Sequence, residues 1–182
     1  MNKMDNDNHQ QILRSGLTLY PSQNKSINKL LGNLIKQVPA QFVLLADVTG
    51  QVVSARGEQN KIDLVALGSL VAGDLAASQE IARITGQYQD SQVALREGKH
   101  TNSFILETGT HLALFVQVAH DVPLGWARMV IKNTAKDITD ILSNTPPEAE
   151  QAKTEAANQP FFDNDDKLPD LFSDALDDLW ME

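Results

Sequence analysis

The residues that could carry out chemistry are few in this chain of 182 residues, and none of them completes a catalytic motif. Gly68 and Gly73 have the spacing of a phosphate-binding loop, but the Lys and Ser/Thr that such a loop needs do not follow them. Asp47-Val-Thr-Gly50 has the residue types of the aspartic-protease triplet, and a hairpin turn explains the same residues fully. We therefore interpret the two glycines as helix-packing positions and the Asp-Val-Thr-Gly segment as a turn.

Metal-binding and nucleophilic residues are equally scattered. The four histidines lie far apart in the sequence, without a spacing at which metal ligands converge: His9, His100, His111 and His120. The chain has no Cys, so a thiolate metal site, a Cys nucleophile and a disulfide framework are excluded. The sequence thus predicts a protein that is not an enzyme and holds no metal or cofactor. The lack of Cys also fits a reducing compartment, and we expect the cytoplasm.

The charge of the chain is concentrated at one end. The net charge is −9, and residues 146–182 carry eleven acidic and two basic side chains, whereas residues 1–145 carry 13 of each. A neutral body with an acidic tail argues against nucleic acid or anionic lipid as a partner, because both attract basic surfaces. No uncharged apolar run approaches the roughly 18 residues of a membrane span.

Hydrophobic spacing predicts the elements that position any functional surface. An amphipathic helix is expected after Ser26, a plausible N-cap, and should end at Pro39. Further helices are predicted at 62–86 and 126–144, and strands at 42–46, 51–55, 92–96, 103–107 and 111–119. Because the strands come in two runs without βαβ alternation, we expect an α+β fold with an antiparallel sheet and helices on both faces.

The chain divides into four parts by composition. We expect residues 1–24 to form a flexible or loosely docked arm and residues 25–145 to form the folded domain. Residues 146–159 lack apolar anchors and indicate a disordered linker. Residues 160–182 form an acidic tail.

The helix at 62–86 is unusual because small residues line up on one side of it. Leucine and valine side chains occupy a neighbouring side and can serve the core, whereas the small side has no evident partner within one chain. We predict that two copies of the chain pack through the small side as a homodimer. The alternative is that the small residues face the sheet and the larger apolar residues face solvent. The predicted dimer residues are Ser69, Ala72, Gly73 and Ala76.

The tail contains a second amphipathic pattern. Apolar residues between 168 and 180 recur at the spacing of one helical face, with acidic residues on the other side. We predict a short helix that forms when it docks into a groove, which could belong to a partner protein or to this chain's own body. The alternative is a solubilising tail. The predicted docking residues are Leu168, Leu171, Phe172, Leu176, Leu179 and Trp180.

The order of elements resembles the Roadblock/LC7 family over residues 25–142. The likeness is carried by the strand-turn-strand at 42–57, the small-residue helix at 62–86, the apolar strand Leu112–Ala119 and the segment Pro123–Arg128. This resemblance implies a five-stranded antiparallel sheet, with the long second helix on one face and the first and third helices on the other. It also implies homodimerisation through the second helix and, as in bacterial members, binding of a small Ras-like GTPase.

Three functions follow from these observations. The first is a non-catalytic regulator of a small Ras-like GTPase, acting as a homodimer that stimulates hydrolysis or exchange. Arg56, Arg96 and Arg128 are candidate arginine fingers in that case, although each also suits an ordinary surface position. The second is a scaffold subunit without effect on nucleotide turnover. The third, a small-molecule sensor, would require an apolar pocket with convergent polar groups, which the sequence does not indicate.

Overall fold

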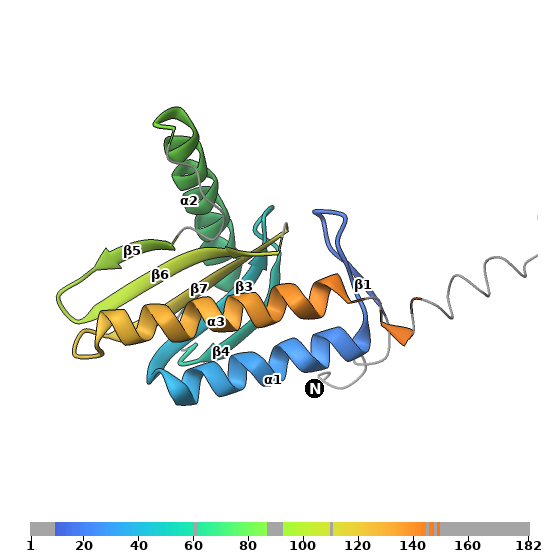
Figure 1. Cartoon of the computed structure of the whole chain (residues 1–182), viewed down its shortest axis with the longest axis horizontal. Helices are drawn as coiled ribbons and strands as arrows, with labels where there is room; N and C mark the ends of the chain where they lie inside the picture. Colours follow the sequence, from blue (N-terminus) through green and yellow to red (C-terminus); the bar gives the residue numbers. More distant parts are fainter. Residues whose placement is uncertain are drawn as a thin grey trace, which may run out of the picture. The chain divides into compact units, whose positions relative to one another are not determined.

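The computed structural model describes residues 10–59, 62–86, 93–109, 111–144, 146, 147 and 149 (Figure 1). Contacts divide the chain into residues 1–146 and 147–182, and the fold below belongs to the first of these units. Its elements are β1 (Gln11–Ile12), β2 (Thr18–Leu19), α1 (Pro21–Gln37), β3 (Ala40–Asp47), β4 (Val52–Gly57), α2 (Leu64–Ile84), β5 (Val93–Glu97), β6 (Thr101–Thr108), β7 (Leu112–Ala119) and α3 (Leu124–Ser143).

The main sheet has five strands in the order β4-β3-β7-β6-β5, and every neighbouring pair is antiparallel. β3 and β7 lie in the middle, and apolar residues at both parities of each strand are buried, as expected of strands covered on two faces. α1 and α3 lie side by side on one face of the sheet, and α2 contacts the other face (Figure 1). The predicted α+β architecture is therefore confirmed.

Alternate residues of β3 show how the two faces are built. Val43 and Leu45 belong to a large apolar cluster with residues of α1 and α3. Phe42 and Leu44 point the other way and pack with Val71 and Leu75 of α2, as the period of two in a strand requires. The cluster on the α1 and α3 face is much the larger of the two.

The first helix begins earlier than predicted. It starts at Pro21, whereas Ser26 lies inside the helix and donates its hydroxyl hydrogen bond to the Ser22 carbonyl. Pro21 suits a first helical position, because its missing N–H would have no partner there. Buried Gln23 completes the start, since its Oε1 accepts the Tyr20 N–H and its Nε2 donates to the carbonyls of Ile141 and Asn144.

The second half of the predicted N-terminal arm is packed against the domain. Residues 10–20 contain the hairpin β1–β2, and its Leu13 and Leu19 side chains are buried in the α1 and α3 cluster. The prediction of a loosely docked arm failed here because Leu13 and Leu19 are too few to form a visible pattern in the sequence. They obtain their burial from a core assembled elsewhere.

Candidate partner-binding surface

Helix α2 is fixed at its N-terminus by its own capping residue. The Asp63 carboxylate accepts hydrogen bonds from the N–H groups of Val65 and Ala66, both at 3.1 Å. This satisfies two of the backbone donors that a helix start leaves unpaired. Val71 and Leu75 are buried against the sheet, and Leu64 and Leu67 pack beside them, as the sequence predicted for this side.

Gly68 brings the backbone of α2 into contact with the turn between β3 and β4. A Cβ atom added to Gly68 would lie 2.5 Å from the Gly50 carbonyl oxygen, and one added to Gly50 would lie 2.7 Å from the Ser69 Cα. Gly50 also has a φ of +90°, which favours glycine. The turn glycine and the helix glycine therefore form one close backbone contact, and this supplies the compensation that Gly68 requires within a helix.

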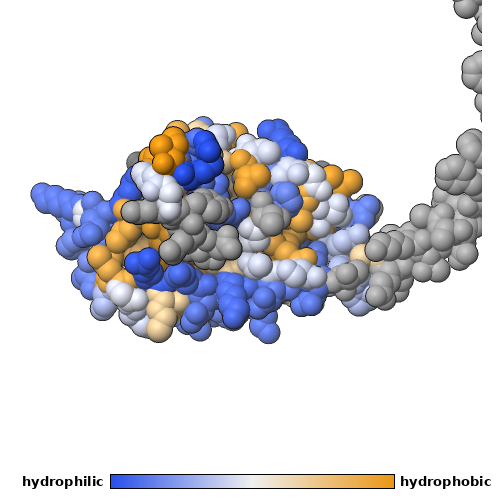
Figure 2. All heavy atoms as spheres, turned by 45° about the horizontal axis from the view of Figure 1, so that its top comes forward, coloured by the Kyte–Doolittle hydropathy of each residue, from blue (hydrophilic) through white to orange (hydrophobic). Residues whose placement is uncertain are grey.

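The outer side of α2 is apolar and open. We define the outer stripe as the residues that recur along this side at intervals of three and four: Ala66, Leu70, Gly73, Ala77, Ile81 and Ile84. Leu70, Ile81 and Ile84 are 70%, 63% and 71% exposed, and Val65 beside them is 74% exposed. Figure 2, in which the α2 side is turned forward, shows apolar side chains on the surface between hydrophilic ones. A single helix that exposes this much apolar area marks an interaction surface.

Polar contacts hold the flanks of α2 to the sheet. Arg96 of β5 donates two hydrogen bonds to the Asp74 carboxylate, one of them 2.8 Å long. The hydrogen bond and the charge of Asp74 raise the pKa of Arg96. Gln79 donates a 2.6 Å hydrogen bond to the Glu107 carboxylate on β6. These contacts join α2 to β5 and β6 of the sheet.

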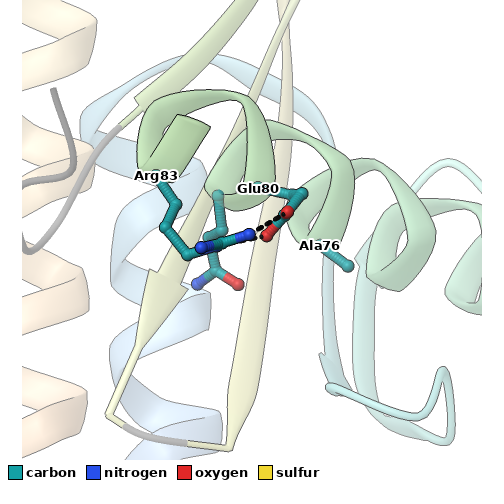
Figure 3. Close-up of a pocket in the computed structure, with 4 residues that line it drawn as sticks. Ala76, Glu80 and Arg83 are labelled. Carbon is teal, nitrogen blue, oxygen red and sulfur yellow. Dashed lines mark hydrogen bonds and ion pairs between the residues drawn. The ribbon is translucent and has the colours of Figure 1, made fainter. Parts of the chain in front are cut away.

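A hollow of about 300 Å³ lies beside the stripe and is lined by Ala76, Gln79, Glu80 and Arg83 (Figure 3). The Arg83 guanidinium reaches back one turn and binds the Glu80 carboxylate at 2.6 and 2.8 Å. This bond lowers the pKa of Glu80 and raises the pKa of Arg83. Because the two charges pair with each other at the surface, the hollow presents no unpaired charge to a ligand.

The described residues bring no metal-binding cluster together. Groups of three or more His, Asp or Glu side chains that could hold a metal ion are absent from this part of the chain. The Asp47 carboxylate, predicted as a turn residue, is fully buried and accepts hydrogen bonds from the turn that follows it.

Comparison with known proteins agrees with this geometry. The structure of MglB from Myxococcus xanthus is 30% identical to the chain, the match covers 64% of this chain and 94% of MglB, and the TM-score is 0.60. A structure described as MglB with a tetrameric arrangement is 25% identical, with 74% and 95% covered and a TM-score of 0.61. A Roadblock/LC7 domain from Streptomyces avermitilis is 18% identical, with 64% and 97% covered and a TM-score of 0.57.

The chain belongs to the Roadblock/LC7 family. No protein-family model matches its sequence, and no curated protein matches it either.

The predicted dimer residues of this Roadblock/LC7 domain differ in their surroundings. Gly73 and Ala76 are exposed, and a Cβ on Gly73 would meet nothing within 4 Å. Ser69 is exposed too, but its backbone supports the Gly50 turn, and Ala72 is buried. The sequence interpretation missed Leu70, Ile81 and Ile84, although their spacing with Gly73 is visible in the sequence.

The three arginines proposed as fingers are also differently placed. Arg56 donates a 2.8 Å hydrogen bond to the Asn28 side chain, and Arg96 is paired with Asp74. The Arg128 guanidinium, at the exposed start of α3, makes no hydrogen bond or ion pair to another described residue. Arg128 is therefore the candidate whose exposed guanidinium can bind a partner without first breaking a bond to another described residue. The predicted docking helix at 168–180 lies outside the described residues.

Helix α2 is, among the helices in the described ranges, the one long and apolar enough to cross a membrane by length and composition, and 22% of that window is buried. Its Asp74 and Gln79 are tied to the sheet of the Roadblock/LC7 domain by the contacts given above. α2 is this apolar because two of its sides carry apolar residues, one that packs against the sheet and one that faces outward.

Proposed function

We infer that this Roadblock/LC7 protein is a non-catalytic regulator that forms a homodimer through the outer stripe of α2 and binds a small Ras-like GTPase. The observation that supports the dimer is the exposure of Leu70, Ile81 and Ile84 on a helix whose opposite side is fully used by the sheet. Complete burial of each such side chain contributes about 1.5–3 kcal/mol. Gly73 and Ala77 at the middle of the stripe allow two helices to approach closely.

The GTPase partner is supported by family membership and by the similarity to MglB. In this proposal the regulator acts by holding the GTPase in one conformation, and the described residues contain no cluster of metal-ligating side chains. Arg128 is available to contact a phosphate or a carboxylate of the partner. The second candidate function is a scaffold that binds the GTPase and leaves hydrolysis and exchange unchanged.

The dimer is tested first, by sedimentation equilibrium of the full chain and of Leu70→Glu. We expect the wild type to be dimeric at micromolar concentration and Leu70→Glu to dissociate at least about tenfold more readily, because a charge would be buried in the contact. The control is Lys29→Glu, which adds an acidic side chain on the exposed side of α1. A monomeric wild type, or equal dissociation of both variants, would contradict the assignment.

The partner is tested with the Ras-like GTPase of the same cell, loaded with GDP or with a non-hydrolysable GTP analogue. Binding that depends on the nucleotide, with a change in the rate of hydrolysis or exchange, supports a regulator. Binding with both rates unchanged supports the scaffold. Absence of binding to either nucleotide state rejects both. Arg128→Ala, compared with Arg56→Ala, then tests whether the unpaired guanidinium contributes.

The acidic segment at 168–180 is proposed as a second contact with the partner. Phe172→Ala combined with Trp180→Ala should weaken GTPase binding and leave the dimer intact. Asp174→Asn is the matched control, since Asp174 lies on the opposite side of the predicted helix. Equal binding by all three proteins, with no change in Trp180 fluorescence on mixing, would reduce the segment to a solubilising tail.

A further inference from the structure

The N-terminal hairpin is connected to the turn between β3 and β4 by two hydrogen bonds. The Ser15 N–H donates to Oδ2 of Asp47 at 3.0 Å, and the Arg14 N–H donates to Oε1 of Gln51 at 2.9 Å. Leu13, next to these donors, is 2% exposed in the main core. The hairpin thus has an apolar anchor and a polar connection to the turn.

Asp47 organises the turn itself with its other oxygen. Oδ1 accepts the Thr49 N–H at 2.9 Å, the Thr49 hydroxyl at 2.7 Å and the Gln51 N–H at 2.8 Å. The Gly50 N–H donates to the Asp47 carbonyl at 2.9 Å. One buried carboxylate therefore determines both the shape of the turn and its connection to the hairpin.

The opposite side of the same turn supports α2. Gly50 contacts the helix backbone at Gly68 and Ser69, where even one added methyl group would clash. This contact lies in the first half of α2, directly below the start of the outer stripe at Ala66 and Leu70. A displacement of the turn would consequently move the helix or open a gap beneath it.

We propose that the hairpin at residues 10–20 positions the partner-binding helix α2 through the Asp47–Gln51 turn, with Asp47 as the positioning residue. This inference rests on the proposed role of the outer stripe. The effect of the hairpin passes through two contacts, hairpin to turn and turn to helix. Loosening the hairpin frees the turn, and a free turn no longer holds the first half of α2 in one place.

The test compares two neighbouring hairpin variants of the full chain by amide hydrogen exchange. Leu13→Ala removes the buried anchor, whereas Ile12→Ala alters a side chain that is 67% exposed. We expect Leu13→Ala to speed exchange of the amides at 64–75 of α2 at least about threefold relative to those of α3, and Ile12→Ala to leave both unchanged. Faster exchange by the same factor in α2 and α3 would mean general destabilisation and would overturn the proposal.

Two further variants keep the test decisive if Leu13→Ala does not fold. Gln51→Ala removes only the acceptor of the Arg14 N–H and should act on α2 in the same direction. Gly50→Ala disturbs the turn at its contact with α2, so it should speed exchange in α2 while the Ser15 amide stays protected. Unchanged α2 exchange in both variants would refute the coupling.

Self-association of the same variants separates this inference from the proposed function. A dimer that weakens at least about threefold in Gln51→Ala supports the coupling. A wild-type monomer with hairpin-dependent exchange in α2 rejects the dimer alone. A stable dimer with unaltered exchange in every variant rejects the coupling alone.

Discussion

The two faces of the sheet are covered to very different extents. On one face α1 and α3 bury a large cluster in which most side chains are completely inaccessible, including Phe104 and Leu114. On the other face α2 alone covers the sheet, and its outer side remains exposed at Leu70, Ile81 and Ile84. The difference fits the division of roles that we propose, in which the first face supplies the stability of the single chain and the second is the surface for association.

The largest expected effect comes from a cavity on the closed face. Phe104→Ala should lower the free energy of unfolding by about 3–5 kcal/mol in urea titration, because the site is fully buried. Phe115→Ala on the α2 face removes a ring that is slightly exposed and contacts Phe42. It should lower the free energy of unfolding by less, about 2–3 kcal/mol. Equal losses of unfolding free energy in the two variants would contradict the proposed difference between the faces.

The next effect concerns the turn that connects the faces. Burial alone would raise the pKa of the Asp47 carboxyl, but hydrogen bonds from the Thr49 hydroxyl and from three backbone N–H groups lower it below its ordinary value of 3.8. Asp47→Asn should reduce the free energy of unfolding at neutral pH by about 1.5–3 kcal/mol, since these bonds have a charged acceptor.

The pH dependence of this difference follows from the lowered pKa. A carboxylate with a lowered pKa stabilises the fold above its unfolded pKa and loses that contribution as the pH falls toward its folded pKa. The gap between wild type and Asp47→Asn should therefore be constant from about pH 7 to about pH 5 and shrink below 3.8. A gap that widens on acidification would contradict the assignment.

Association should appear as a concentration dependence of stability. If two copies share the outer stripe, each tenfold increase in protein concentration raises the free energy of unfolding of the dimer by about 1.4 kcal/mol. Differential scanning calorimetry should then show a melting temperature that rises with concentration for the wild type. Ile84→Glu should melt at one temperature throughout, and a wild type that also does so would remove the evidence for association.

The smallest effect is expected at the flank of α2. Arg96→Ala breaks the ion pair with Asp74. Because the arginine is 63% exposed, the substitution should lower the free energy of unfolding by at most about 1 kcal/mol. If the pair keeps the outer stripe correctly oriented, Arg96→Ala should lower the free energy of dimer dissociation by more than this value. Lys99→Ala on the following turn is the control, and identical dimer dissociation for both would show that the pair has no orienting role.

The sequence predicted the parts of the fold that rest on regular periodicity. Strands β3 and β7, the order of elements and the inner side of α2 follow from apolar spacing, because a strand or helix must bury that side somewhere. The start of α1 did not, since Gln23 donates to the carbonyls of Ile141 and Asn144, which only the folded chain brings near. Short hairpin strands such as β1 and β2 lack the length for a pattern.

The predicted dimer residues do not all lie on the open side of α2. Gly73 and Ala76 were identified from their small size and are exposed as expected, but Ala72 is buried and Ser69 supports a turn. Small residues serve equally well for contacts within a chain and between chains, so their size alone does not say which side of the helix is open. Only the position of α2 on the sheet decides this.

The composition of the outer stripe has a consequence for the entropy of association. Ala66, Gly73 and Ala77 lose no side-chain conformational entropy when a partner covers them. Only the side chains of Leu70, Ile81 and Ile84 lose such entropy, which costs about 0.5–1 kcal/mol each. The ties from Asp74 and Gln79 to the sheet have already ordered the backbone beneath them. A surface built in this way loses little side-chain entropy on association, so more of its burial energy is left to offset the loss of translational and rotational freedom.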